Sequence, residues 1–185
     1  MNKKRLSDLI FKVLDRARDI FFLYFKWKIL FGKIGNGSFV KRGVKVSGNP
    51  RRIEIGRNFK IWENCTLGVG KGKIIIGDNG LLGVNTFINS SEGTVKIGDN
   101  VAIAPYTQIY SYTHHFEKDK LVTDCDRVGD VTIENNVLIG SNVIILPGIT
   151  IHEGAIIAAG AVITSDVPSN KIYGGIPAKE LGTIE

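Results

Sequence analysis

A chain of 185 residues can bury the core of one domain, and 43% hydrophobic with 23% charged residues is ordinary for a globular protein. The net charge of +6 arises in residues 1–33, which carry nine Lys or Arg and three Asp, whereas the rest of the chain holds fifteen basic and fifteen acidic residues. This argues against nucleic-acid binding, which needs a basic stripe on the folded surface. Cys65 and Cys125 form no CxxC pair, which excludes a disulfide framework or a cysteine zinc cluster and fits a cytoplasmic location.

The basic segment 1–33 predicts an amphipathic helix. Apolar residues recur there at alternating steps of four and three from Leu6 to Phe31, and Gly32 can end the helix. Its longest apolar run is too short to span a bilayer, and no small-residue cleavage site marks a signal peptide. Two interpretations stay open. The helix packs on its own body or on a neighbouring subunit, or residues 1–31 make peripheral contact with the inner face of a membrane.

From residue 34 onward, aliphatic residues recur every six positions, and the fifth position of each hexad is apolar or small. The aliphatic positions are Ile34, Val40, Val46, Ile55, Ile61, Leu67, Ile76, Leu82, Ile88, Ile97, Ile103, Ile109, Ile133, Ile139, Ile145, Ile151, Ile157 and Ile163. The fifth positions include Phe59, Cys65, Thr86, Val101, Thr107, Val137, Val143, Ile149, Ala155 and Ala161. A period of six fits neither a helix nor simple strand alternation, so it predicts a short strand and a turn, repeated.

A second period indicates how the hexads are stacked. Early hexads return after 21 residues, from Ile34 to Ile55, and late ones after 18, from Ile133 to Ile151. Three hexads per turn predict an all-β fold, a parallel β-helix in the form of a three-sided prism, with coils about 4.8 Å apart. We expect this prism to span residues 34–167, followed by a C-terminal tail at 168–185.

The hexads stop between Ile109 and Ile133, which predicts an extended loop at about 110–132. Long loops in compact domains are usually functional. This one contains the adjacent His114 and His115. A neutral imidazole can take a proton from a hydroxyl group near pH 7. The alternative is that both histidines are ordinary surface residues.

The sequence resembles the left-handed β-helix hexapeptide acyltransferases, and within them the galactoside, maltose and exopolysaccharide O-acetyltransferase branch. Three stretches carry the resemblance: residues 97–105 (IGDNVAIAP), 137–148 (VLIGSNVIILPG) and 175–179 (GIPAK). It implies a left-handed coil, a homotrimer with active sites between neighbouring prisms, and acetyl-CoA as co-substrate, with no metal.

The same resemblance assigns roles to individual residues. It implies His114 as the general base, with His115 as the alternative if the alignment is off by one. The backbone at Ser141 would meet the thioester carbonyl, Ala159 and Thr164 would line the coenzyme arm, and Lys179 would lie near the adenosine phosphate end. Two residues depart from the family pattern: Gly83 replaces a sugar-binding Asn, and Ser165 replaces a Lys that contacts the coenzyme.

We therefore expect an acetyl-CoA-dependent O-acetyltransferase that acts on a sugar hydroxyl in cell-surface polysaccharide synthesis. The main alternative is an N-acetyltransferase acting on a nucleotide-linked amino sugar. A non-catalytic β-helix is a remote alternative, as is a γ-type carbonic anhydrase. The latter needs three zinc-binding histidines, and the third histidine, His152, lies far along the chain.

Overall fold

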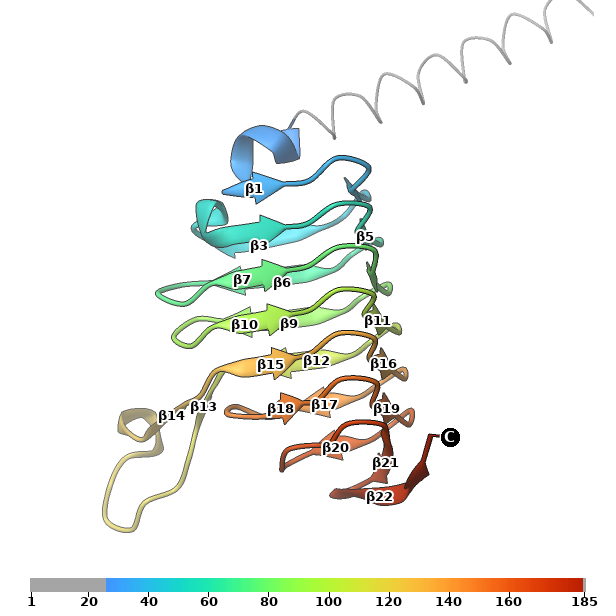
Figure 1. The fold of residues 1–185 in the computed structure, drawn as a ribbon. Helices are drawn as coiled ribbons and strands as arrows, with labels where there is room; N and C mark the ends of the chain where they lie inside the picture. Colours follow the sequence, from blue (N-terminus) through green and yellow to red (C-terminus); the bar gives the residue numbers. More distant parts are fainter. Residues whose placement is uncertain (1–25, 185) are drawn as a thin grey trace, which may run out of the picture.

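The computed structural model describes residues 26–184, which form a column of stacked triangular coils (Figure 1). Each coil contributes one strand to each of three parallel sheets, and these sheets are the three sides of the column. The prediction of an all-β, three-sided left-handed β-helix is confirmed. We call the sheets A, B and C in the order in which the chain first enters them.

The strands are short, because each side of a triangular coil holds only a few residues before the next corner. Sheet A contains β1 (Lys33–Ile34), β4 (Ile53–Ile55), β7 (Ile74–Ile76), β10 (Val95–Ile97), β15 (Val131–Ile133) and β18 (Thr150–Ile151). Sheet B contains β2 (Phe39–Val40), β5 (Lys60–Ile61), β8 (Leu81–Leu82), β11 (Ala102–Ile103), β16 (Leu138–Ile139), β19 (Ile156–Ile157), β21 (Lys171–Gly175) and β22 (Ala178–Thr183). Sheet C contains β3 (Lys45–Gly48), β6 (Thr66–Val69), β9 (Phe87–Ser90), β12 (Gln108–Tyr110), β17 (Ile144–Ile145) and β20 (Val162–Ile163).

The six-residue pattern predicted which side chains fill the column. Ladder residues pair in register from coil to coil, for example Ile55 with Ile76 and Ile103 with Ile139. All of them are buried except Ile34 and Val46 of the first coil, which are partly buried. The ten residues at the fifth position are buried as well. The core is therefore a stack of aliphatic layers, each of which is stabilised by its neighbours.

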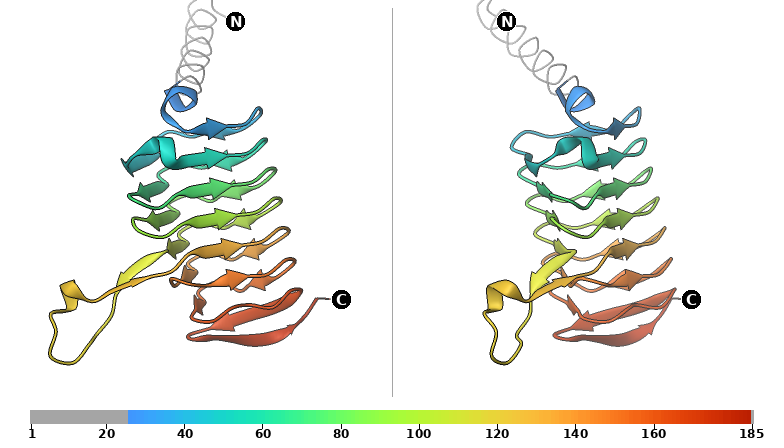
Figure 2. Two further views of the ribbon diagram at one scale, coloured as in Figure 1. Left: turned by 60° about the vertical axis from the view of Figure 1, so that its left-hand side comes forward. Right: turned by 90° about the vertical axis from the view of Figure 1, so that its left-hand side faces the viewer.

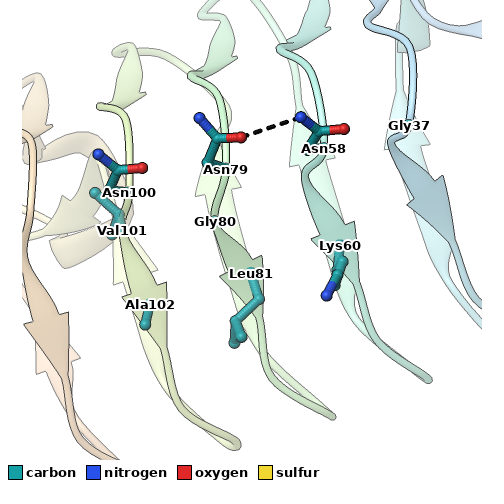
Figure 3. Close-up of a pocket in the computed structure, with 9 residues that line it drawn as sticks. All are labelled: Gly37, Asn58, Lys60, Asn79, Gly80, Leu81, Asn100, Val101 and Ala102. Carbon is teal, nitrogen blue, oxygen red and sulfur yellow. Dashed lines mark hydrogen bonds between the residues drawn. The ribbon is translucent and has the colours of Figure 1, made fainter.

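Two corner positions explain the glycine and asparagine content. A Cβ on Gly35 would lie 2.5 Å from the Gly56 carbonyl of the next coil, so the backbones approach too closely there for a side chain. Other corner residues adopt positive φ, and among the described non-glycine residues most of these are asparagines, as at Asn58 and Asn79. The Asn58 Nδ2 donates to Asn79 Oδ1 at 3.1 Å, which links adjacent coils (Figure 3).

Only the end of the predicted N-terminal helix lies within the described residues. Residues 26–30 are helical, and Trp27 and Phe31 are buried and stacked with ring centroids 5.0 Å apart. These two rings cover the apolar end of the column, so this part of the helix packs on its own body. The rest of the predicted helix, including most of the candidate membrane-contact segment 1–31, lies outside the described residues. No helix in the described part of the chain is long and apolar enough to cross a bilayer.

The loop expected at about 110–132 is an insertion in one coil. Ile97 pairs with Ile133, 36 positions later, whereas Ile133 pairs with Ile151, 18 positions later. This loop contains regular secondary structure. It begins and ends as an antiparallel ribbon of β13 (Tyr112–His114) and β14 (Asp126–Val128), with the 3-10 helix η2 (Val122–Asp124) just before β14. Figure 2 shows the ribbon projecting from the side of the column.

Two further segments complete the architecture. The 3-10 helix η1 (Pro50–Arg52) takes up the three extra residues of the 21-residue coils at one C–A corner. At the other end, β21 pairs with β19 in parallel and then turns back antiparallel to β22. The C-terminal tail thus extends sheet B and ends the column.

Candidate active site

The base of the ribbon pairs a histidine with a carboxylate. The register of β13 and β14 sets His114 directly opposite Asp126, and Nδ1 of His114 lies 3.1 Å from Oδ1 of Asp126. An ionised carboxylate only accepts hydrogen bonds, so Nδ1 of the neutral ring carries the proton and the lone pair is on Nε2. Both side chains are about half exposed. An imidazole held in this tautomer can take a proton from a ligand at Nε2.

Tyr112 holds the same carboxylate from a second direction. Its hydroxyl donates to Oδ1 of Asp126 at 2.9 Å, and its ring meets the His114 ring edge-on with centroids 5.3 Å apart. The hydrogen bond to Asp126 raises the pKa of Tyr112, so the phenol remains a donor. The Tyr112 hydroxyl is 3.4 Å from Nε2 of His114, too long for a strong hydrogen bond, which leaves Nε2 available.

His115 is oriented differently from its neighbour. Its Nε2 lies 2.9 Å from Oε1 of Glu117, which also pairs with Lys120, and these two partners lower the pKa of Glu117. The other ring nitrogen, Nδ1, is buried and has no hydrogen-bond partner among the described residues. Nε2 of His115 is therefore already paired with Glu117, and its Nδ1 is inaccessible to a ligand. The geometry favours His114 over His115 as a proton acceptor.

Two of the predicted coenzyme-binding residues lie on one edge of the column. Ser141 follows β16 and Ala159 follows β19 at the B–C corner, and the Gly160 N–H donates to the Ser141 carbonyl at 2.8 Å. Ser141 and Ala159 thus occupy equivalent positions in adjacent coils. Their own N–H groups donate to no other described residue. Unpaired N–H groups at such a corner can donate to a ligand carbonyl.

The same edge leads to the predicted phosphate-binding lysine. Gly174 of β21 packs against Ala158, since a Cβ on Gly174 would lie 2.9 Å from the Ala158 Cβ. Lys179 of β22 pairs with Gly174 and is exposed, with no ion pair to another described residue. Ser141, Ala159 and Lys179 therefore follow one line toward the C-terminal end. Thr164 lies apart from them, beyond β20 at the C–A corner.

One prism does not bring these two sets of residues together. The ribbon with His114 leaves the column at the C–A corner, whereas Ser141 and Ala159 lie at the B–C corner, at the ends of β16 and β19. In Figure 1 the ribbon projects to the left and these two strands lie on the right. A site that uses both sets must be completed by a second prism.

Comparisons with known proteins agree with this architecture. A family model described as bacterial transferase hexapeptide (six repeats) matches residues 130–165, and one described as hexapeptide repeat of succinyl-transferase matches residues 73–104. A maltose O-acetyltransferase from Clostridium difficile 630 is 30% identical, with 86% of this chain and 73% of that chain covered and a TM-score of 0.56. The chain belongs to the hexapeptide-repeat acyltransferases. No curated protein matches the sequence.

Two other structures of this family are similar. AntD, an N-acyltransferase from Bacillus cereus in complex with dTDP-4-amino-4,6-dideoxyglucose and coenzyme A, is 26% identical, with coverage of 85% and 87% and a TM-score of 0.78. A hexapeptide-repeat acetyltransferase from Vibrio cholerae is 27% identical, with coverage of 88% and 79% and a TM-score of 0.63. Hexapeptide-repeat acyltransferases that resemble the chain thus include both N- and O-acyltransferases.

Two features of this acyltransferase lie outside the candidate site. A shallow groove beside sheet B is lined by the corner asparagines, including Asn58, Asn79 and Asn100 (Figure 3). The Asn58 and Asn79 amides bond to each other, so the groove follows from the corner ladder. His152 pairs with Glu134 at 3.3 Å, and no group of three metal-ligating side chains occurs among the described residues.

The sequence alone did not identify Asp126 and Tyr112. Asp126 is one of several acidic residues in the insertion, and no motif marks it. Only the antiparallel register brings it to His114 from twelve positions away. Tyr112 stands two residues before His114, which places both side chains on one face of a strand, and this spacing was the one available signal.

Proposed function

We propose that this acyltransferase moves the acetyl group of acetyl-CoA to a sugar hydroxyl in the synthesis of a cell-surface polysaccharide, such as capsule, O-antigen or exopolysaccharide. The observation that carries the proposal is the His114–Asp126 pair, which leaves Nε2 of His114 available. A hydroxyl group is a poor nucleophile until a base takes its proton. The similarity to a maltose O-acetyltransferase also supports a hydroxyl acceptor.

The proposed reaction is direct transfer within a ternary complex. Nε2 of His114 takes the hydroxyl proton while the sugar oxygen attacks the thioester carbonyl carbon. The N–H of Ser141 donates to the oxyanion, the carbon–sulfur bond breaks, and the imidazolium returns its proton to the CoA thiolate. The products are a sugar acetyl ester and CoA. Asp126 stabilises the imidazolium while the proton resides there.

The coenzyme is proposed to lie along the B–C corner. Ala159 lines the pantetheine arm one coil beyond Ser141, and Lys179 neutralises phosphate charge at the far end, where its ammonium group has no carboxylate partner among the described residues. Thr164 is assigned to the arm by resemblance alone. It can take that role only if a neighbouring prism bends the arm toward the C–A corner.

A homotrimer is part of the proposal. His114 and Ser141 lie at different corners of one prism, so the loop of one subunit must reach the coenzyme edge of the next. Three-fold symmetry gives every subunit the same contact. The mass in dilute solution, measured by light scattering, should be three times that of the chain. An active monomer would contradict the shared site.

The second candidate is N-acylation of a nucleotide-linked amino sugar. AntD supports it, because the structural similarity to AntD covers 85% of this chain. A neutral amine is already nucleophilic and needs a base less than a hydroxyl does. The oriented His114 therefore favours the hydroxyl acceptor.

Product analysis separates the two candidates. The protein is incubated with labelled acetyl-CoA and, in parallel, extracted cell-surface glycan, maltose or dTDP-4-amino-4,6-dideoxyglucose. A labelled glycan that loses its acetyl group in mild alkali indicates O-acetylation. An alkali-stable product on the amino sugar would replace this proposal with N-acylation, and labelling of none of the three would reject both.

A further inference from the structure

One corner residue departs from the rule that the other coils follow. The B–C corner has a residue with positive φ in each of six coils, and these residues are Gly43, Asn64, Asn85, Tyr106, Asn142 and Gly160. Five are glycine or asparagine, which tolerate the left-handed region. Tyr106, with φ of 63°, is the only aromatic residue among all the described residues with positive φ. A bulky side chain in this conformation is an outlier.

The stability of the fold does not explain this tyrosine. The Tyr106 side chain is 53% exposed, and it takes part in no hydrogen bond, ion pair or ring contact with another described residue. Its backbone N–H bonds to the Val84 carbonyl at 3.0 Å, as an asparagine N–H does at the equivalent place. Asparagine would therefore keep the backbone contact and avoid the strain. Backbone strain that no packing interaction compensates is typical of functional positions.

The location of Tyr106 indicates which function. The Asn142 N–H donates to the Pro105 carbonyl at 3.0 Å, so Pro105 and Tyr106 lie directly against Ser141 and Asn142 of the next coil. The proposed coenzyme path starts at Ser141 and runs to Ala159 and Lys179, away from Tyr106. Tyr106 is thus on the coil just beyond the acyl end of the coenzyme, where an acceptor has to lie.

The preceding coil approaches the coil of Tyr106 closely at Gly83. Gly83 has no side chain, and a Cβ there would lie 2.5 Å from the Pro105 nitrogen, so this position cannot carry a polar group toward the acceptor. The exposed phenol ring of Tyr106 is a large side chain beside this glycine. Sugar rings have an apolar C–H face that packs on aromatic rings, and a phenol adds a hydrogen-bonding group at the rim.

We propose that Tyr106 is a specificity-determining residue of the acceptor site, where its ring packs against the apolar face of the sugar that receives the acyl group. The inference rests on the proposed function, because the coenzyme path defines which side of Ser141 the acceptor occupies. It adds a residue that recognises the acceptor without taking part in proton transfer.

The test compares Tyr106→Asn and Tyr106→Phe with the unchanged protein, using labelled acetyl-CoA and whichever acceptor is labelled among extracted cell-surface glycan, maltose and dTDP-4-amino-4,6-dideoxyglucose. Tyr106→Asn should raise the KM for the acceptor roughly three- to tenfold, as loss of one aromatic contact does. The KM for acetyl-CoA should not change. Tyr106→Phe keeps the ring and should stay within about twofold of the unchanged protein.

A stability measurement excludes a merely structural role. Tyr106→Asn should melt at the same or a higher temperature, whereas Asn64→Tyr, at the same corner two coils away, should lower Tm by roughly 2–4 °C. An unchanged acceptor KM in Tyr106→Asn would overturn the inference and leave the proposed function intact. A lower Tm with loss of trimer mass would make Tyr106 an interface residue instead. An unchanged protein that labels no acceptor would reject the proposed function and this inference together.

Discussion

Nδ1 of His114 and Oδ1 of Asp126 lie 3.1 Å apart because the two residues are direct cross-strand partners in the ribbon of β13 and β14. The backbone register therefore fixes this contact. A shift of the register by one residue would turn the carboxylate to the opposite face of the ribbon. The insertion thus has two effects. It places His114 outside the column, and the register of its two strands determines which nitrogen of the His114 ring is free to accept a proton.

His114→Ala should lower kcat by about 10²–10⁴-fold, the usual cost of losing a general base, with little change in the KM for acetyl-CoA. Its side chain is exposed on the ribbon and outside the aliphatic core, so Tm should stay within about 2 °C. Steady-state kinetics and thermal melting check both expectations.

His115→Ala is the matched control for that variant. Its ring is held by Glu117 and its Nδ1 is buried, so it should reduce kcat far less. If His115→Ala is the inactive variant instead, the base is His115 and the ribbon must change conformation on binding. A loss below tenfold in both variants would reject a histidine base.

Asp126→Asn should lower kcat at least tenfold and leave the KM for acetyl-CoA unchanged. The amide can still accept from Nδ1 but carries no charge to stabilise the imidazolium, and the loss should stay below the roughly 10⁴-fold of a fully buried triad. Glu117→Gln, which alters the partner of His115, is the control. Equal losses in both variants would mean that carboxylates of the loop act only on its folding.

The repeat was predictable from the sequence because each coil obeys the same local constraint. Three features recur along the hexads: a buried aliphatic ladder, a small residue where backbones meet, and a left-handed corner. Positions such as Ile55 and Gly56 are therefore indicated by the same pattern in many coils. The eighteen ladder positions fall in the three sheets as the period predicts.

The insertion was not predictable to the same depth because no repeat constrains it. His114 could be singled out by its chemistry, but its partner depends on an antiparallel register that a single sequence does not encode in any periodic signal. The strain at Tyr106 was likewise hidden, because only the structure shows that Asn64 and Asn85 occupy the equivalent corner positions.

Lys179→Ala should raise the KM for acetyl-CoA several-fold and leave kcat nearly unchanged, because removal of a distant phosphate contact weakens ground state and transition state alike. Lys171→Ala is the matched control, since Lys171 is already paired with Glu180 at 2.7 Å in the same hairpin. A fall in kcat in Lys179→Ala, with an unchanged KM for acetyl-CoA, would remove Lys179 from the coenzyme site.

Ile139→Ala and Leu138→Ala test the core on two adjacent residues. Ile139 is buried in the ladder, so its truncation should cost about 2–5 kcal/mol. Leu138 points to the outside of sheet B and is 47% exposed on a single prism, so where no neighbouring subunit covers it, its truncation should change the free energy of unfolding by less than about 0.5 kcal/mol. Urea unfolding measures both. A large effect at Leu138 would show that another subunit covers this face.

Cys65 gives the column a specific sensitivity to alkali. Burial raises the pKa of its thiol from 9.0 to about 11, whereas in the unfolded chain the thiol ionises at its ordinary pKa. A raised pKa in the folded state stabilises the fold below pH 9, and this contribution is lost as pH rises from about 9 to 11. The loss should be of the order of 3 kcal/mol at most. Under reducing conditions, Cys65→Ala should flatten the fall of the urea midpoint across that interval, although the variant starts less stable because a cavity remains.

Cys125→Ala controls for loss of a thiol in the insertion. If the pH profile of Cys65→Ala runs parallel to that of the unchanged protein, the thiol ionises without unfolding and the buried position must open to solvent.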